Sequence, residues 1–396
     1  MDSFIYALVM VPALRQLLPR SHIPPSAANI GFYGGLLFAL FLVGWGFAFV
    51  WGPIADRFGR VPTLMLTILC YSLFTFLGAG AANVWQLAAY RLLAGLGIGG
   101  EWAMGGTFVA EEWPEDRRKM ASAYMHTGYY FGVLLAGAAN SIVGANYGWR
   151  AMFALGGTPA LLVAFIRYGV NEPQRWEVQQ KPSMRKAFLA LFSSEYRRRT
   201  LLNSIYLLVS IVGLWAGSVY VPAAVTQVAA REGFSPRQGT QFASYGTILL
   251  SVGTILGCLI LPPLAEKLGR RAALAFYFTL MLIFIPVSFG YVFYLRKGAL
   301  VWFLVCLFFL GLGGANFGMY TLWLPEQYRT ECRASAFAFS TSVGRFVGAG
   351  ITFLVGAGVS HFHTLGIPVA LTGAAFAVGI LLLPLGVETR GKPLPA

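Results

Sequence analysis

The chain has 396 residues, of which 57% are hydrophobic and 11% are charged, and its formal net charge is +14. Soluble domains average roughly 25% charged residues. A water-soluble protein of this size could not bury so much apolar surface, so we expect an integral membrane protein. The basic residues gather in short loops between apolar runs, which is typical of multi-pass membrane proteins and argues against nucleic-acid binding.

The uncharged runs predict twelve membrane-spanning helices, because about 20 helical residues cross the hydrocarbon core of a bilayer. The first six cover about residues 3–18, 30–52, 61–80, 84–109, 120–143 and 149–169. The second six cover about residues 200–226, 241–264, 272–294, 299–323, 334–360 and 364–386. The expected fold class is an all-α membrane protein with two six-helix bundles, at 1–169 and 200–387, a linker at 170–199 and a tail at 388–396.

A short charged loop after the second predicted helix is repeated at half the chain length. Residues 52–60 contain an acid, a base, a glycine and an arginine, and residues 262–270 repeat that order. Residues 114–118 and 325–329, which both begin with Pro-Glu, form a second repeat at nearly the same offset. Two repeats at a common spacing predict two pseudo-symmetric halves.

We expect the repeated loops to form a conformational gate, in which acids and bases hold helix ends together at one membrane face. A latch of about 1–3 kcal/mol would shift a two-state equilibrium several-fold to about a hundred-fold. The alternative is that these charges only set the membrane topology. Glu111 and Glu112 are expected to join Arg117 and Arg118 in this network. The gate residues are Gly52, Asp56, Arg57, Gly59, Arg60, Glu115, Arg118, Glu266, Arg270, Glu326 and Arg329.

Most of the Lys and Arg residues fall in one set of loops, which includes both repeats and the linker. The positive-inside rule places that set in the cytoplasm. Both chain ends are then cytoplasmic, and we expect a multi-pass protein of the plasma (inner) membrane.

The charged loops resemble the loop signature of the major facilitator superfamily of secondary transporters. Arg91–Gly100, an arginine followed by alternating glycines, resembles the fourth-helix signature of that family. The resemblance to its sialate/carboxylate:proton symporter group rests on residues 2–4, 99–102, 113–115 and 171–173. Sugar and aromatic-acid symporters share parts of this pattern. The resemblance implies two six-helix bundles that rock about a central site in alternating access.

Charged residues inside the predicted helices are candidates for proton coupling, because a charge at the bilayer centre costs roughly 2.5–3.5 kcal/mol. Glu101 is the leading candidate, since burial favours the protonated form of a carboxyl group. Arg91, ten residues earlier, would bind an anion or keep such an acid deprotonated. Asp2 resembles the first-helix aspartate of the family. The alternative for Glu101 and Arg91 is helix packing, and for Asp2 a solvated terminal acid.

Arg345 is the leading candidate for substrate binding. It lies twelve residues past Arg333 in the eleventh predicted helix, about 18 Å deeper at 1.5 Å per residue. A guanidinium group at that depth suits a bidentate pair with a carboxylate, and the alternative is a structural pair with a neighbouring helix. Further polar candidates for the central site, each of which has a packing alternative, are His126, Tyr33, Asn140, Asn316 and Tyr320.

The expected function is proton-coupled symport of a small organic anion, such as a monocarboxylate or a sugar acid, by a monomer. A neutral-sugar or aromatic-acid symporter and a transporter-like receptor that does not transport are the alternatives. We expect no enzymatic activity, since no nucleophile–base pair is spelled out. No cofactor or metal is expected either, because residues 95–100, which look like a nucleotide loop, lie inside an apolar helix.

Overall fold

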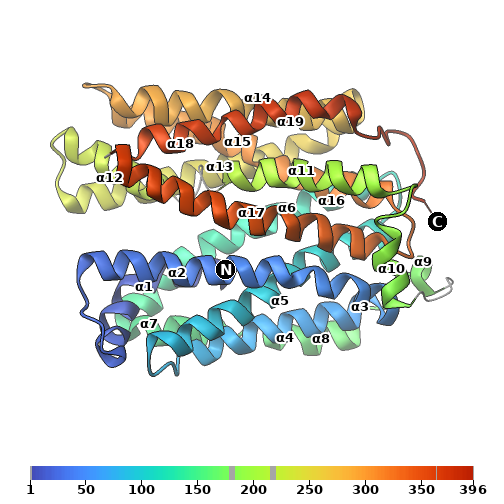
Figure 1. The fold of residues 1–396 in the computed structure, drawn as a ribbon, viewed down its shortest axis with the longest axis horizontal. Helices are drawn as coiled ribbons and strands as arrows, with labels where there is room; N and C mark the ends of the chain where they lie inside the picture. Colours follow the sequence, from blue (N-terminus) through green and yellow to red (C-terminus); the bar gives the residue numbers. More distant parts are fainter. Residues whose placement is uncertain (1, 178–182, 215–219, 363, 396) are drawn as a thin grey trace.

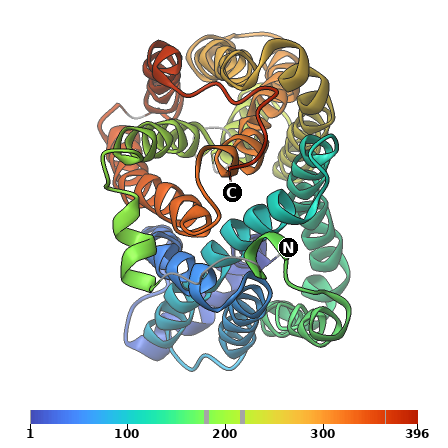
Figure 2. The same cartoon turned by 90° about the vertical axis from the view of Figure 1, so that its right-hand side faces the viewer.

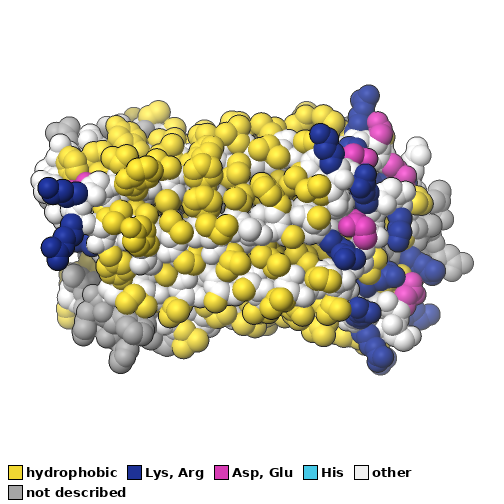
Figure 3. All heavy atoms as spheres, turned by 90° about the horizontal axis from the view of Figure 1, so that it is seen from above, with side chains coloured by type: hydrophobic (Ala, Val, Ile, Leu, Met, Phe, Trp, Pro, Cys, Tyr) yellow, Lys and Arg dark blue, Asp and Glu magenta, His cyan; other side chains and the backbone are white. Residues whose placement is uncertain are grey.

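The computed structural model describes residues 2–177, 183–214, 220–362 and 364–395, and every regular element in these ranges is a helix. Seven of the described helices are long and apolar enough to cross a membrane by length and composition. Figure 3 shows an apolar belt around the middle of the molecule, with Lys and Arg side chains at its two ends. This distribution matches a bilayer with water on both sides.

The first half of the chain forms the lower layer in Figure 1. Its helices are α1 (Asp2–Leu17), α2 (Ala27–Gly46), α3 (Trp51–Phe58), α4 (Arg60–Gly78), α5 (Val84–Glu112), α6 (Arg118–Ala139), α7 (Ala145–Leu155) and α8 (Ala160–Gly169). A 3-10 turn joins α2 to α3, so the two together correspond to the second predicted helix. Helix α6 packs against α13 and α16 of the second half as well as against α5. We call this layer the first bundle.

The second half of the chain forms the upper layer, which we call the second bundle. Its helices are α11 (Arg197–Leu214), α12 (Val221–Arg231), α13 (Pro236–Leu268), α14 (Arg270–Ile285), α15 (Ala299–Gly314), α16 (Asn316–Trp323), α17 (Arg333–Phe362), α18 (Gly366–Thr372) and α19 (Ala374–Leu382). Helix α11 and helix α12 flank residues 215–219, which lie outside the described residues. The break between α17 and α18 falls where the sequence predicted a division of one long uncharged run.

Corresponding helix pairs show the same close packing in the two bundles. A Cβ atom on Gly95 of α5 would lie 2.0 Å from the Phe41 carbonyl oxygen of α2. A Cβ atom on Gly311 of α15 would lie 2.1 Å from the Leu250 carbonyl oxygen of α13. Only glycine permits backbones to approach so closely. Each bundle therefore contains a corresponding pair of helices in direct backbone contact.

The linker contains two short helices, α9 (Gln174–Glu177) and α10 (Met184–Ala190). Phe188 of α10 contacts both bundles: its ring lies 6.2 Å from that of Phe49 and 5.7 Å from that of Phe339, between ring centroids. Figure 2 shows this end of the molecule, with the C-terminus between the two bundles. The linker and the tail therefore meet at the same end.

Candidate functional site

The end that carries the linker and the tail is rich in arginine, and we call it the basic rim. It consists of the α3–α4, α5–α6, α13–α14 and α16–α17 loops, the linker, and residues 383–395. Figure 3 shows Lys, Arg, Asp and Glu side chains gathered at this end. Both repeated loops predicted from the sequence lie here. Each turns at a glycine with positive φ, Gly59 at +117° and Gly269 at +88°, a conformation that glycine adopts without steric cost.

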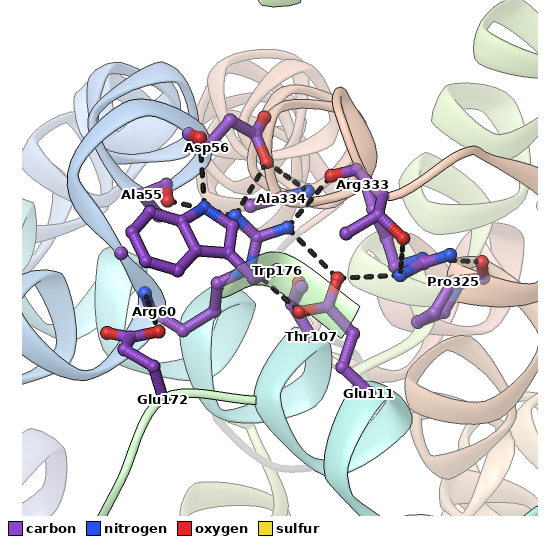
Figure 4. Close-up of polar contacts among 12 residues, drawn as sticks. Ala55, Asp56, Arg60, Thr107, Glu111, Glu172, Trp176, Pro325, Arg333 and Ala334 are labelled. Atoms are coloured by element: carbon purple, nitrogen blue, oxygen red, sulfur yellow. Dashed lines mark hydrogen bonds and ion pairs between the residues drawn. The ribbon is translucent and has the colours of Figure 1, made fainter. Parts of the chain in front are cut away.

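Glu111 of α5 joins the two bundles at the centre of the basic rim (Figure 4). The Arg60 guanidinium donates to Glu111 through Nε at 2.8 Å and Nη2 at 2.9 Å. Arg333, at the start of α17, donates to the same carboxylate through Nη1 at 2.6 Å. All three side chains are fully buried. One acid thus forms ion pairs with an arginine from each bundle.

Asp56 forms a second connection between the bundles, at the N-terminus of α17. Its carboxylate accepts from the Ala334 N–H at 3.3 Å, the Ser335 N–H at 2.9 Å and the Ser335 hydroxyl at 2.5 Å. Arg60 lies 3.2 Å away as its ion-pair partner. Gly52 packs against the same turn, since a Cβ there would lie 2.5 Å from the Ser335 Cα. A helix N-terminus favours a negative charge, so this acid stabilises the contact between α3 and α17.

The second copy of the loop also forms an arginine–glutamate pair, and both residues of this pair belong to the second bundle. Arg270 donates to Glu326 through Nε at 3.0 Å and Nη2 at 2.8 Å. Its connections to the first bundle are weaker. Arg118 lies 3.9 Å from Glu326, and Glu266, which is half exposed, accepts from Lys119 at 2.6 Å. The second copy therefore supplies one buried and one exposed ion pair to the interface.

The structural counterpart of Glu326 is Glu111, not the Glu115 that the Pro-Glu alignment predicted. The glutamates of the two arginine–glutamate pairs and the arginines at the start of α6 and α17 fit an offset of 215 residues, from Glu111 to Glu326 and from Arg118 to Arg333. The alignment used an offset of 211. It therefore placed Arg329 opposite Arg118, whereas Arg333 occupies that position.

Several other rim residues of the sequence analysis lie on the surface. Arg57, Glu112 and Arg329 are exposed. Arg117 pairs with Asp116 at 3.6 Å, and both side chains are about 70% exposed. Glu112 and Arg117 are thus solvated at the rim, and Glu111 takes part in the buried network instead.

The tail crosses the basic rim from the second bundle to the first. The Thr389 hydroxyl donates to Glu326 at 2.6 Å. The Leu394 N–H donates to Glu115 at 3.2 Å, and Arg175 of the linker donates to Glu115 at 3.0 Å and to the Leu394 carbonyl at 3.4 Å. The hydrogen bond from the Leu394 N–H, followed by that from Arg175, lowers the pKa of Glu115. Leu394 itself is buried, so the tail is a packed part of the rim.

Arg345 lies far from the rim charges and is 6% exposed. Its Nη1 donates to the Thr341 carbonyl at 3.1 Å. The guanidinium carbon lies 3.8 Å from the ring centroid of Trp45 and 5.6 Å from that of Trp102, both in the first bundle. Among the described residues, no carboxylate forms an ion pair with it. The site therefore holds a buried positive charge, between the bundles, whose partners are a carbonyl and two aromatic faces.

A series of neighbouring aromatic side chains lies next to Arg345. We call this cluster, which consists of Trp102, Phe317, His126 and Tyr129, the aromatic ring. Trp102 of α5 lies 6.0 Å from Phe317 of α16, Phe317 lies 6.2 Å from His126 of α6, and His126 lies 6.3 Å from Tyr129, between ring centroids. The Tyr129 phenol lies within electrostatic range of the Arg345 guanidinium. Trp102, His126 and Tyr129 belong to the first bundle and Phe317 and Arg345 to the second, so these side chains lie at the interface between the bundles.

Two buried polar atoms, His126 Nε2 and Asn316 Oδ1, have no hydrogen-bond partner in the part of the chain that the structure describes. His126 is 8% exposed and Asn316 is fully buried. Asn316 opens α16 and holds its other amide atom, Nδ2, on the Gly313 carbonyl at 2.8 Å. Tyr320, one turn further along α16, is committed to the second bundle through Ser210 Oγ and the Tyr206 carbonyl, both at 2.7 Å.

The remaining candidates lie inside the first bundle. Glu101 is partly buried and hydrogen-bonds with the Tyr71 side chain of α4. Arg91 is buried, with its guanidinium carbon 4.5 Å from the Tyr6 ring centroid and 4.1 Å from that of Phe41. Ten residues of α5, or about 15 Å of helix, separate these two candidates from each other.

Two predicted substrate ligands lie away from the aromatic ring, and one proton-site candidate has a side chain that the structure does not describe. Tyr33 packs edge-on against Trp85 at 6.0 Å, within the first bundle. Asn140 is half-buried in the π-helical turn that follows α6. Neither belongs to the aromatic ring. Asp2 is the first residue of α1, and its side chain lies outside the described residues.

Comparison with known proteins matches the chain to a large family along most of its length. The family model described as "Major Facilitator Superfamily" matches residues 1–353. The probable 4-methylmuconolactone transporter of Cupriavidus pinatubonensis is 30% identical over 386 residues, covering 92% of this chain and 83% of that protein. The sialic acid transporter NanX of Escherichia coli is 28% identical over 88% of this chain and 82% of its own length.

Among solved structures, the proton:xylose symporter XylE bound to 6-bromo-6-deoxy-D-glucose superposes with a TM-score of 0.80. The match covers 99% of this chain and 94% of that one, at 19% sequence identity. At this identity the similarity concerns the fold alone.

Proposed function

Because the chain belongs to the Major Facilitator Superfamily and has its all-α transporter fold, as its sequence predicted, we propose that it is a proton-coupled symporter of a small organic anion. It is a membrane transporter and not an enzyme. The transported solute and the coupling ion are the proposed parts.

Arg345 carries the proposal for an anionic substrate. A buried charge is destabilising unless an opposite charge compensates it, and no carboxylate of the described residues pairs with this one. A substrate carboxylate would supply the missing charge in bidentate geometry. A relative named as a sialic acid transporter agrees with an acidic solute.

Glu101 is the proposed proton carrier. It follows Gly100, which packs against Thr67 of α4, and its side chain is partly buried. Its partner is a tyrosine hydroxyl, which accommodates either protonation state of a carboxyl group. Asp2 is the second candidate. Arg91, about 15 Å from Glu101 along the helix, stabilises the packing of α1 and α2 through its aromatic contacts.

The basic rim is the proposed gate. We place it in the cytoplasm by the positive-inside rule, with both termini, in a bacterial inner membrane. Because the buried ion pair of Glu111 with Arg333 and the hydrogen bonds from α17 to Asp56 hold the bundles together at this end, the proposed gate is closed in this structure. Transport then requires these contacts to break and re-form in every cycle. The protein is proposed to work as a monomer.

The test is uptake of radiolabelled organic acids by the full chain in proteoliposomes, with and without an imposed proton gradient. We expect accumulation that depends on the gradient, and its loss in Arg345→Gln. Arg296→Gln, which removes an exposed arginine at the opposite end, is the matched control. Acid uptake that persists in Arg345→Gln, or that ignores the gradient, would refute the anion site or the proton coupling, respectively. Uptake of neutral sugars by both variants would favour a sugar symporter.

A further inference from the structure

The aromatic ring has two chemically different poles. One pole is the Arg345 guanidinium, contributed by the second bundle. The other is the pair of unpartnered polar atoms, His126 Nε2 from α6 and Asn316 Oδ1 from α16. Between the poles lie the rings of Trp102, Phe317 and Tyr129. A ligand that spans this region meets positive charge, aromatic faces, and then neutral hydrogen-bonding groups.

Unpaired polar atoms at this depth require an explanation, because most buried side-chain polar atoms in folded proteins have a partner. His126 is held between two nearly parallel rings, at 6° to Tyr129 and 11° to Phe317. The flanking rings therefore fix the orientation of the imidazole without using its Nε2. Asn316 is fixed in the same way by its bond to the Gly313 carbonyl. Both side chains are pre-positioned, and each has one polar atom without a partner among the described residues.

Resting on the proposed anion site, we infer that the substrate carries a second, uncharged hydrogen-bonding group, such as a hydroxyl, remote from its carboxylate, and that His126 recognises that group. A plain monocarboxylate satisfies Arg345 and leaves His126 Nε2 and Asn316 Oδ1 unpaired. A site built with polar groups discriminates against ligands that leave them unpaired. His126 is therefore a specificity-determining residue.

Arg345 and His126, at the two poles, belong to different bundles, so a substrate that binds both contacts both bundles. Arg345 belongs to α17, and His126 belongs to α6 of the other bundle. A substrate with groups at both poles contacts both bundles, whereas a plain acid has a polar contact only at the Arg345 pole. The hydroxyl-bearing substrate thus stabilises the approach of the bundles around itself more than the plain acid does.

Matched ligands test this inference by binding to the purified full chain, measured by calorimetry. The probes are benzoate, 3-hydroxybenzoate, 4-hydroxybenzoate and methyl 4-hydroxybenzoate. We expect at least one hydroxybenzoate to bind about tenfold more tightly than benzoate, from one added hydrogen bond to a buried group. The methyl ester, which has no carboxylate, should not bind.

Variants of His126 identify the residue responsible. His126→Phe keeps an aromatic side chain at this position. It should lower the affinity for hydroxybenzoate to the affinity of the wild-type protein for benzoate. His126→Gln, which retains a donor and an acceptor, should keep part of the preference and guards against a simple folding defect. Tyr33→Phe, which removes a hydroxyl outside the aromatic ring, is the matched control and should keep the full preference.

The outcomes separate the two proposals. Equal binding of benzoate and both hydroxybenzoates, or a preference that survives in His126→Phe, overturns this inference and leaves the Arg345 site standing. Binding of the methyl ester as tightly as the acid overturns the proposed anion site, and the inference with it.

Discussion

The two copies of the charged loop occupy equivalent places in the two bundles but hold the opposite bundle differently. Asp56 accepts three hydrogen bonds from the first turn of α17 and is fully buried. Glu266, its counterpart, reaches Lys119 with a side chain that is 55% exposed. Hydrogen bonds to a charged group contribute about 1.5–3 kcal/mol when buried, whereas exposed ion pairs contribute about 0–1 kcal/mol. The first copy of the loop therefore contributes most of the free energy that holds the two bundles together at the basic rim.

The arginine–glutamate pairs within each bundle, Arg60–Glu111 and Arg270–Glu326, are in contrast nearly identical. Each is a bidentate arginine–glutamate pair with distances between 2.8 and 3.0 Å. The halves differ where a second arginine crosses the interface. Arg333 reaches Glu111 at 2.6 Å, whereas Arg118 stays 3.9 Å from Glu326 and donates instead to the Ala110 carbonyl. The duplication thus kept the scaffold of each half and diverged in the contacts between the halves.

The largest effect is expected from replacing the acid at the centre of the stronger copy. Glu111→Gln leaves Arg60 and Arg333 buried without their common anion, and breaking a buried pair costs about 3–5 kcal/mol. Alkylation of Cys332, which is fully buried beside α17, reports opening of the rim once Cys70, Cys258 and Cys306 are replaced by serine. We expect Cys332 to react at least about tenfold faster in Glu111→Gln.

Glu326→Gln is the matched comparison, since it removes the equivalent acid from the second bundle. Its principal partner, Arg270, belongs to the same bundle. We expect this variant to lower thermal stability while Cys332 labelling rises less than in Glu111→Gln. Equal labelling of the two variants would contradict the asymmetry of the gate.

A smaller contrast is expected between Asp56→Asn and Glu266→Gln. The first weakens buried hydrogen bonds to the Ala334 and Ser335 N–H groups, at a cost of about 1.5–3 kcal/mol. The second removes an exposed ion pair and should cost less than about 1 kcal/mol. Transport rates in proteoliposomes and Cys332 labelling measure both, and raising the salt concentration should erase only the Glu266 effect. A larger effect at Glu266 would reverse the comparison.

The tail should contribute less again, because its contacts to the first bundle are partly exposed. Glu115→Ala removes the acceptor of the Leu394 N–H and of Arg175, and we expect Cys332 labelling to rise about two- to fivefold, equivalent to less than about 1 kcal/mol. Asp116→Ala, which removes the neighbouring exposed acid, is the control and should have no effect. Equal responses would show that the tail does not hold the rim closed.

The fold could be predicted from the sequence because the length of an apolar run indicates a membrane-spanning helix and a repeated charged loop indicates two related halves. Helix lengths and the loop repeats predicted the fold, and Arg345 stood out as a charge deep in a helix. The sequence did not distinguish Glu111 from Glu115, since both are acids near the end of α5 and only the turn of the helix decides which one faces Arg60. Trp45, Tyr129 and Phe317 gave no signal, because aromatic residues in apolar helices usually pack in the core.

The smallest contrast concerns two carboxylates that cap equivalent helices. Glu172 accepts from the first N–H groups of α4 at 2.9 and 2.8 Å, and Glu388 accepts from those of α14 at 3.0 and 3.2 Å. Burial raises the pKa of Glu172 despite these bonds. Burial also opposes ionisation of Glu388, but its backbone hydrogen bonds prevail and lower its pKa. The same capping position therefore shifts the carboxyl pKa in opposite directions in the two halves.

These directions predict opposite pH dependence for the two capping variants. A lowered folded-state pKa contributes stability above the unfolded value, about 4.3, and that stability is lost as the pH falls through the folded pKa. A raised pKa contributes stability at low pH that is lost as the pH rises through the folded value. At pH 7, Glu388→Gln should therefore lower the melting temperature more than Glu172→Gln, by the equivalent of about 1 kcal/mol for a helix cap. Melting curves between pH 7 and 4.5 should show the two penalties converging, because wild-type Glu172 gains stability as it protonates; a gap that widened on acidification would mean that the two caps do not differ as their surroundings indicate.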